Sequence, residues 1–342
     1  MELFRALGAL AEPPGPAHAR LGGLLGLTGA PEPAAHTELF LLNAYPYASV
    51  YLGAEGMLGG EARDRVAGFW RALGLAPPPE PDHLSALLGL YAALTERMKE
   101  RREEEADPAP RVPGEPGEEH REGGRAESGP AEADLWARAR RALLREHLLP
   151  WLPPYLLKVE ELGSPFYEGW ARLLRESLRE EAEALGVLAD APDRSNGGPN
   201  PRPPGEAGPR AAPPRGAEAA ELLPLHLREA PPLPDPAQGS GTPEEFLEAL
   251  LAPVRSGLIL WRTDLARAAR ELGLGARIGS RAFVLRALFS QHGPATLGWL
   301  AAEARRWAER HRSLRGMTRI AAGFWAERAA RTAAVLERLG AA

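Results

Sequence analysis

The sequence predicts an all-α protein, and three observations lead to that fold class. Apolar residues recur three and four positions apart in nearly every segment that carries them, which is the spacing of a helix face. Apolar residues at alternating positions, which would indicate strands, do not form runs long enough for a sheet. Two stretches rich in proline and glycine separate the helical segments. We therefore expect a helical body that is interrupted twice.

The helical spacing is clearest in three segments. After Leu84, apolar residues fall on one face at Leu87, Tyr91, Leu94 and Met98. The same spacing follows Pro165, at Phe166, Trp170, Leu173, Leu174, Leu178 and Leu185. It returns near the end of the chain, at Ile320, Phe324, Trp325, Thr332, Val335, Leu336 and Leu339. Each segment is predicted to bury this face against neighbouring helices.

The two interruptions suggest how the chain is divided. Residues 99–132 carry many charges and almost no large apolar side chain, so they cannot bury enough surface to offset their ordering entropy, and we expect disorder there. Residues 188–242 form a Pro/Gly-rich linker, in which the apolar stretch "LLPLHL" at 222–227 is expected to dock on the body. The prediction is a helical core at 1–187, with 99–132 inserted in it, and a helical C-terminal lobe at 243–342.

The composition of the chain excludes several classes of function. The formal charge of −5 argues against a nucleic-acid surface, which needs positive charge against phosphates. No cysteine is present, so disulfides and thiolate metal sites are excluded. The first residues lack the basic and apolar regions of a signal peptide, and no apolar run is long enough to span a membrane. These features predict a cytoplasmic protein that does not insert into a membrane.

The stretch "NAYPYASVYLG" at 43–53 holds three of the six tyrosines in the chain, Tyr45, Tyr47 and Tyr51. Pro46 restricts the residue before it to an extended conformation, and glycines follow at Gly53 and beyond, so the stretch is predicted to be a loop between helices. Either the rings cap the apolar ends of a helical bundle with their hydroxyls in water, or the loop holds a ligand.

A second motif, "EPDHLSALLGLYAAL" at 80–94, opens a predicted helix. Pro81 suits the first helical position, and Asp82 suits the first turn because its charge complements the helix dipole. Asp82 and His83 do not make a convincing acid–base pair, because neighbouring residues on a helix point in different directions and no nucleophile motif accompanies them.

Together these motifs resemble the TorD/DmsD/NarJ family, the dedicated chaperones of molybdenum oxidoreductases. The resemblance rests on "YPYASVYLGAEGMLGG" and on "PDHLSALLGLYAAL" about 20 residues later. It extends through "LREHLLPWLPPYLLKVEELGSPFYEGWARLL" at 144–174, and covers about 37–100 and 133–187. The chain differs at Ala48, Leu87 and Gly89, where family members often carry acidic residues.

The resemblance implies a TorD-like helical bundle that binds the N-terminal region of an apo molybdopterin oxidoreductase subunit. That region is often a twin-arginine signal peptide, and the chaperone holds the subunit until its cofactor is inserted. An amphipathic segment fits a groove between helices, with tyrosines as contact area and carboxylates facing its arginines. The candidate binding residues are Tyr45, Pro46, Ser49, Tyr51, Glu55, Glu80, Pro81, Asp82 and His83. No cofactor of its own, no catalytic residue and no metal site is expected.

Other interpretations stay open at this point. A helical adaptor for an unrelated protein partner shares most of these features. Residues 263–289 invite a helix-turn-helix interpretation, although a hairpin with Leu265, Ala268, Ala269 and Leu272 packed inward suits the acidic chain better. The eight histidines show no metalloprotease or paired-ligand spacing, and Arg305, Arg306, Arg310 and Arg312 read as a basic helix end. The identity of the oxidoreductase and the oligomeric state, including a homodimer, are not decided by the sequence.

Overall fold

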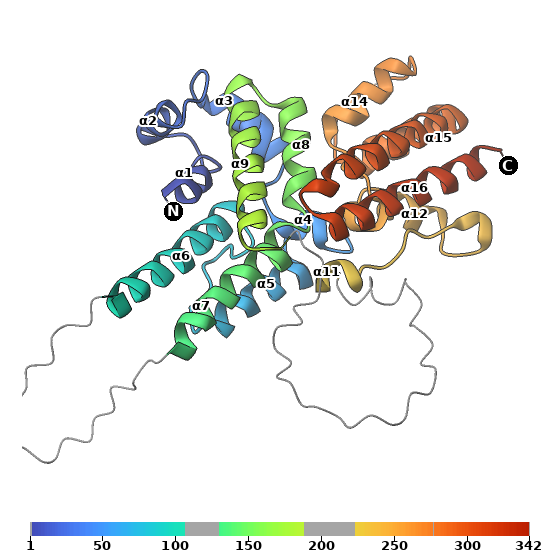
Figure 1. The fold of residues 1–342 in the computed structure, drawn as a ribbon. Helices are drawn as coiled ribbons and strands as arrows, with labels where there is room; N and C mark the ends of the chain where they lie inside the picture. Colours follow the sequence, from blue (N-terminus) through green and yellow to red (C-terminus); the bar gives the residue numbers. More distant parts are fainter. Residues whose placement is uncertain (1, 107–129, 188–222, 276, 342) are drawn as a thin grey trace, which may run out of the picture.

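The computed structural model describes residues 2–106, 130–187, 223–275 and 277–341, and these ranges are all-α (Figure 1). Within them the only strand-like pairing is one isolated bridge between Tyr47 and His83. The predicted fold class is therefore confirmed. In chain order the helices, with η marking π and 3-10 turns, are α1 Glu2–Ala9, α2 Pro16–Leu24, α3 Pro33–His36, η1 Thr37–Asn43, α4 Ala48–Leu52, α5 Gly60–Ala72, α6 Leu84–Ala106, α7 Pro130–Ala142, η2 Leu143–Leu148, α8 Leu152–Leu162, α9 Pro165–Ala184, α11 Leu225–Arg228, η4 Pro236–Gln238, α12 Pro243–Leu250, α13 Pro253–Ser256, α14 Arg262–Glu271, α15 Arg281–Ser313, η5 Leu314–Gly316 and α16 Arg319–Ala341.

The N-terminal half is a bundle in which α1 packs on α6, α6 on α7 and α8 on α9. Large aromatic side chains fill its centre, and Trp151, Tyr155 and Trp170 are fully buried. Buried indole groups need a hydrogen-bond acceptor. Trp170 meets this need by donating from Nε1 to the carbonyl of Leu7 over 2.9 Å, which ties α9 to α1.

Several predicted boundaries differ from the observed ones. Helix α6 continues to Ala106, eight residues into the segment expected to be disordered, and residues 107–129 of that segment lie outside the described residues. The same helix begins at Leu84, three residues after the predicted start at Pro81. The loop predicted over 43–53 is wrong for Ala48–Leu52, which form the short helix α4.

The C-terminal lobe is built on the long helices α15 and α16, which lie side by side (Figure 1). Helix α15 is broken at His292, whose φ of −158° and ψ of 85° are not helical, two residues before Pro294. The inward packing predicted for residues 263–289 is confirmed for Leu265, Ala268 and Ala269, which are buried in α14. No helix in the described parts of the chain is both long and apolar enough to cross a membrane.

The two halves share one continuous hydrophobic core. Trp325 on α16 donates from its indole to the Pro150 carbonyl over 2.6 Å. The loop after α4 also rests on the lobe, because at Gly56, with φ of +62°, a Cβ atom would come within 2.7 Å of the Cα atom of Ala252. Only glycine permits this close approach with a left-handed backbone. The lobe is thus in direct contact with the segment that carries the tyrosine-rich motif.

Candidate functional site

Backbone hydrogen bonds join the two sequence motifs. The N–H of Leu84 donates to the carbonyl of Pro46 over 2.8 Å, and the N–H of Ala48 donates to the carbonyl of Asp82 over 3.0 Å. The isolated antiparallel bridge between Tyr47 and His83 lies between these bonds. We call residues 46–49 and 82–84 the motif junction. Residues that the sequence places in two separate motifs are therefore direct neighbours in the fold.

Asp82 caps a helix to which it does not belong. Its carboxylate accepts the N–H of Ser49, in the first turn of α4, over 3.0 Å, and the residue is only 2% exposed. The first N–H groups of a helix have no intrahelical acceptor, so a carboxylate there satisfies a donor and complements the dipole. The prediction that Asp82 serves the first turn of its own helix was wrong, because α6 starts two residues later and Asp82 is bonded across the junction.

The outward side of the motif junction carries a polar cluster. The Tyr47 hydroxyl donates to Glu80 Oε2 over 2.7 Å, and its ring meets His83 edge-on at a centroid distance of 4.7 Å. His83 Nδ1 lies 2.7 Å from Ser85 Oγ, which donates in turn to Glu12. Burial lowers the pKa of His83, and the nearby carboxylates of Glu12, Glu80 and Asp82 oppose that shift. Burial and the bond to Glu80 raise the pKa of Tyr47, so its hydroxyl remains a donor.

The three tyrosines of the first motif occupy different environments. Tyr51 is 1% exposed, stacks on Trp151 at 5.3 Å and meets Tyr155 edge-on. Tyr45 and Tyr47 are only partly buried. Tyr51 therefore belongs to the bundle core and shapes the surface from beneath, while the other two rings reach that surface.

The other residues predicted for the site are likewise either buried or exposed. Pro46, Ser49, Pro81, Asp82 and His83 are buried at the junction. The hydroxyl of Ser49 accepts the N–H of Gly59 over 3.1 Å and so fixes the loop that follows α4. The exposed members of the predicted site are Glu55 and Glu80.

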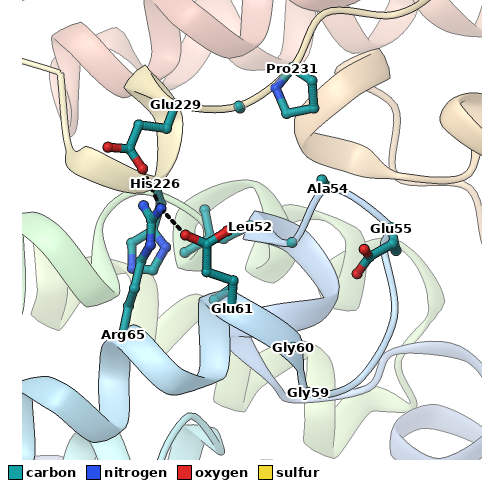
Figure 2. A pocket seen from close by; sticks show the side chains of 13 residues that line it. Leu52, Ala54, Glu55, Gly59, Gly60, Glu61, Arg65, His226, Glu229 and Pro231 are labelled. Carbon is teal, nitrogen blue, oxygen red and sulfur yellow. Dashed lines mark hydrogen bonds and ion pairs between the residues drawn. The ribbon is translucent and has the colours of Figure 1, made fainter.

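A groove of about 270 Å³ opens beside Glu55, between the start of α5 and the segment around α11 (Figure 2). Glu55, Glu61 and Glu229 contribute carboxylates to it, and among the described residues Arg65 lines it as a cation. The Arg65 guanidinium donates to Glu61 over 2.6 Å and also to Glu229. Glu55 has no ion-pair partner within the described ranges. We call this the acidic groove.

One buried histidine lines the acidic groove, and a second buried histidine contacts it from the bundle. His226, on α11, lines it, and its ring meets that of His147 edge-on at 5.5 Å. Burial lowers the pKa of His226 to about 4, with the Arg65 charge adding to the shift. Burial also lowers the pKa of His147 to about 3, and the neighbouring His226 contributes. Both rings are therefore neutral near pH 7, and they hold α11 against the bundle as uncharged groups.

Sequence reasoning missed Glu61 and Glu229 as neighbours of Glu55. Glu61 was detectable, because it opens the helix that follows the glycines after the tyrosine motif. Glu229 was not, because more than 160 residues separate it from Arg65 in the chain. The only available signal was the apolar stretch "LLPLHL", whose Leu227 is buried against the core and brings Glu229 to the groove.

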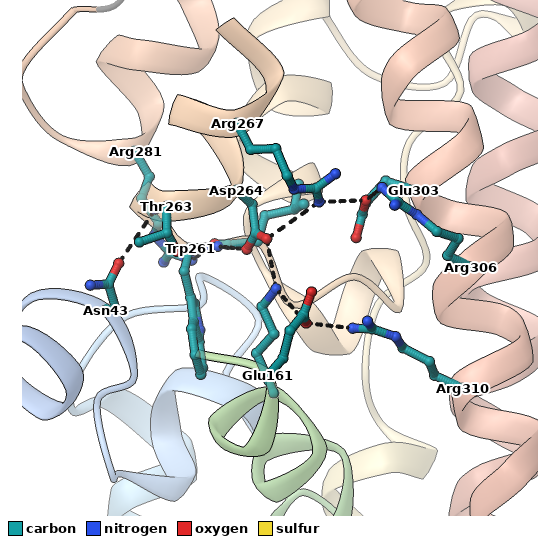
Figure 3. A network of polar contacts seen from close by, with 12 residues as sticks. Asn43, Glu161, Trp261, Thr263, Asp264, Arg267, Arg281, Glu303, Arg306 and Arg310 are labelled. Atoms are coloured by element: carbon teal, nitrogen blue, oxygen red, sulfur yellow. Dashed lines mark hydrogen bonds and ion pairs between the residues drawn. The ribbon is translucent and has the colours of Figure 1, made fainter. Parts of the chain in front are cut away.

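A second polar cluster joins the bundle to the lobe (Figure 3). The fully buried Lys158 on α8 donates from Nζ to Asp264 over 2.6 Å and to Glu161 over 3.0 Å. Arg310 donates to Glu161 over 2.8 Å, and Arg267 donates to Glu303 over 2.9 Å. Burial alone would raise the pKa of Glu161, but the bond from Arg310 and the charge and bond of Lys158 lower it to about 2.

Metal ligation has no candidate in the ranges that the structure covers. No group of three or more His, Cys, Asp or Glu side chains there has the arrangement of a metal site.

Residues 33–156 match the family model described as "Nitrate reductase delta subunit". The chain carries a NarJ/TorD-type region. The family resemblance found in the sequence is thereby confirmed, and the family is one of molybdoenzyme maturation chaperones, which are not catalytic. No curated protein and no solved structure matches the chain. The NarJ/TorD-type region contains the whole motif junction and, in the acidic groove, Glu55 and Glu61, whereas Glu229 comes from outside it.

Proposed function

We propose that this protein is a cytoplasmic, non-catalytic chaperone that binds the N-terminal leader of an apo molybdopterin oxidoreductase subunit and holds the subunit for cofactor insertion. The NarJ/TorD-type region supports the class of activity and the class of partner. The leader that we propose is of the twin-arginine type, with adjacent arginines followed by an apolar stretch.

The observation that carries the proposal is Glu55 on the rim of the acidic groove, which has no ion-pair partner among the residues that the structure describes. Glu61 and Glu229 already hold the Arg65 guanidinium there, so the groove has the carboxylate geometry that a guanidinium needs. A client arginine would add to this arrangement by pairing with Glu55. Carboxylate–guanidinium pairs are directional, so they also fix the register of the bound segment.

Exposed apolar side chains follow Glu55 in the chain. Met57, two residues later, is 68% exposed, and Leu58, three residues later, is 55% exposed. Exposed large apolar residues beside an acidic groove suit a segment that is basic at one end and apolar at the other. The flexible methionine side chain adapts to varied apolar partners. It therefore suits a site that binds leaders of one type whose apolar side chains differ in sequence.

The other residues predicted for the site take two roles in this proposal. Tyr45, Tyr47 and Glu80 offer contact area and charge on the outward side of the motif junction. Pro46, Ser49, Tyr51, Pro81, Asp82 and His83 shape the surface from within, since they are buried.

The proposal is tested with a fluorescent peptide that carries two adjacent arginines followed by an apolar stretch, titrated with the full chain and followed by anisotropy. The Glu55→Gln/Glu61→Gln double variant is expected to bind at least about tenfold more weakly, as lost charge-assisted bonds imply. Glu309→Gln, an exposed change on α15, is the matched control and leaves binding unchanged. Equal binding of a peptide with glutamines in place of both arginines would remove the basis of the proposal.

A further inference from the structure

A basic groove lies at the turn between α15 and α16, and its lining shares no residue with that of the acidic groove. It encloses about 660 Å³, and Arg312, Arg315 and Arg319 line it together with Ile320 and Phe324. The volume falls in the range of about 300–1,000 Å³ typical of ligand sites. In a chain whose formal charge is −5, this concentration of arginine calls for an explanation.

The groove arginines differ from the neighbouring arginines of α15 in their ion pairs. Arg305 pairs with Glu337, Arg306 with Glu303 and Arg310 with Glu161. Arg312, Arg315 and Arg319 have no carboxylate partner within the described ranges, and all three are exposed. The basic helix end seen in the sequence therefore contains two kinds of arginine, those that pair with a carboxylate and those that have no such partner in the part of the chain that the structure describes.

A carboxylate that lines the groove is already paired with another arginine. Glu327 lines the groove, but it pairs with Arg331 one helical turn further along α16. The groove thus offers positive charge without an internal counter-ion among the residues described.

Arg319 sits where its charge is unfavourable. It is the first residue of α16, a helix with no acidic residue in its first turn. The N-terminus of a helix carries partial positive charge, so an arginine there opposes the dipole, and two more arginines nearby add repulsion. A bound anion would relieve both effects and would also meet the free N–H groups of the first turn.

The floor of the groove is apolar. Ile320 and Phe324 are half-buried on successive turns of α16, and Arg328 covers one face of the Phe324 ring at 4.9 Å from its centroid. Arg319 and Ile320 also line an adjoining cavity together with Arg145 and Leu149, so the groove continues towards the NarJ/TorD-type region.

We propose that the basic groove binds an acidic, apolar-bearing peptide segment of a partner protein, with carboxylates on Arg312, Arg315 and Arg319 and an apolar side chain on Ile320 and Phe324. Unpaired arginines recognise carboxylates by paired hydrogen bonds, and a half-buried apolar floor recognises a side chain between them. The concave shape favours an inserted chain over the flat surface of an anionic membrane. The basic leader of the proposed client would be repelled here, so this is a second, separate contact.

The test is anisotropy of a labelled peptide of alternating glutamate and leucine, titrated with the full chain. We expect binding that weakens as salt rises from about 50 to about 300 mM. The Arg315→Gln/Arg319→Gln double variant is expected to bind at least about tenfold more weakly. Arg305→Gln, which removes an arginine paired with Glu337 outside the groove, is the matched control and leaves binding unchanged.

Three outcomes would overturn the inference. The first is no binding of the peptide by the native chain. The second is equal binding of a peptide with glutamine in place of glutamate, and the third is recruitment to phosphatidylserine vesicles through the same arginines without peptide binding. Because the peptide is acidic, failure here leaves the acidic groove and its basic client untouched, so the two proposals fail separately.

Discussion

At the scale of single residues, Asp82 shows how a motif residue can serve the fold. Replacing Asp82 with alanine leaves the N–H of Ser49 buried without its acceptor. We expect the free energy of unfolding to fall by about 1–3 kcal/mol, the cost of an unsatisfied buried donor. Chemical denaturation followed by circular dichroism measures this loss.

The matched control is Glu80→Gln. Glu80 is exposed, and its side chain accepts the Tyr47 hydroxyl, a bond that glutamine can still accept. We expect a change below about 0.5 kcal/mol, as for most surface substitutions. If Asp82→Ala were as mild as this control, the capping role of Asp82 would be refuted.

The buried histidines predict how stability depends on pH. The pKa values of His147 and His226 in the folded chain, about 3 and about 4, lie below the unfolded value of about 6.5. As the pH falls, the histidines of the unfolded chain therefore bind protons before those of the folded chain do. Their contribution to the free energy of unfolding is fully present above about pH 6.5 and is lost as the pH falls towards 4. At pH 5 the loss is about 2 kcal/mol for each ring.

Melting temperatures at pH 7.5, 6 and 5 test this dependence. His226→Leu is expected to reduce the loss on acidification, because one of the rings that must stay neutral is gone. His292→Gln, at an exposed position, is the control and keeps the native pH profile. An unchanged profile in His226→Leu would contradict the assignment.

The candidate site was only partly readable from the sequence at this scale. Spacing and composition drew attention to Tyr45, Tyr47 and Tyr51, but not to the fact that Tyr51 stacks on Trp151 inside the core. Which ring faces inward depends on α4, and α4 depends on a carboxylate from a distant segment. Local propensity does not contain that information.

At the scale of elements, the contact between α8 and α14 depends on the buried pair of Lys158 and Asp264. Lys158→Met removes the nearer of the two cations that contact the buried Asp264 carboxylate and leaves Arg267 at 3.6 Å. We expect the free energy of unfolding to fall by about 3 kcal/mol. The Lys158→Met/Asp264→Asn double variant is expected to be more stable than Lys158→Met alone, because the buried carboxylate charge is then removed as well. Denaturation of both variants measures the difference.

An exposed ion pair is the control for this buried one. Arg305 and Glu337 are both largely in solvent, so Arg305→Gln should lower the free energy of unfolding by less than about 1 kcal/mol. If the Lys158→Met/Asp264→Asn variant were no more stable than Lys158→Met, the buried charge would not be what couples α8 to α14.

The helices themselves were largely predictable. The apolar faces after Leu84, after Pro165 and from Ile320 correspond to α6, α9 and α16. Periodicity succeeds there because long amphipathic helices each bury one face. The start of α6 and the existence of α4 were missed because the motif junction, a tertiary contact, decides both.

At the scale of the whole molecule, the C-terminal lobe and the bundle share one core. Trp325 bonds to Pro150, and Gly56 rests against Ala252, so neither half keeps its surface when the other is removed. We expect one cooperative unfolding transition for the full chain. Scanning calorimetry tests this, and two resolved transitions would show that the halves unfold independently.

The family match covers only part of the surfaces that we propose to bind partners. Residues 33–156 carry the chaperone-type region, while the basic groove and one carboxylate of the acidic groove come from later segments. Motifs in the sequence predicted the chaperone-type region. They could not predict the two grooves, because both grooves depend on segments that meet only in the folded chain.

The most direct measurement is capture of partners from cell extract with the tagged full chain, followed by mass spectrometry. We expect recovery of a molybdopterin oxidoreductase catalytic subunit that still bears its N-terminal leader and lacks its cofactor. We also expect the Glu55→Gln/Glu61→Gln variant to recover less of that subunit than Glu309→Gln does. Stoichiometric recovery of an unrelated protein, with no such subunit present, would contradict the chaperone assignment and favour a general helical adaptor.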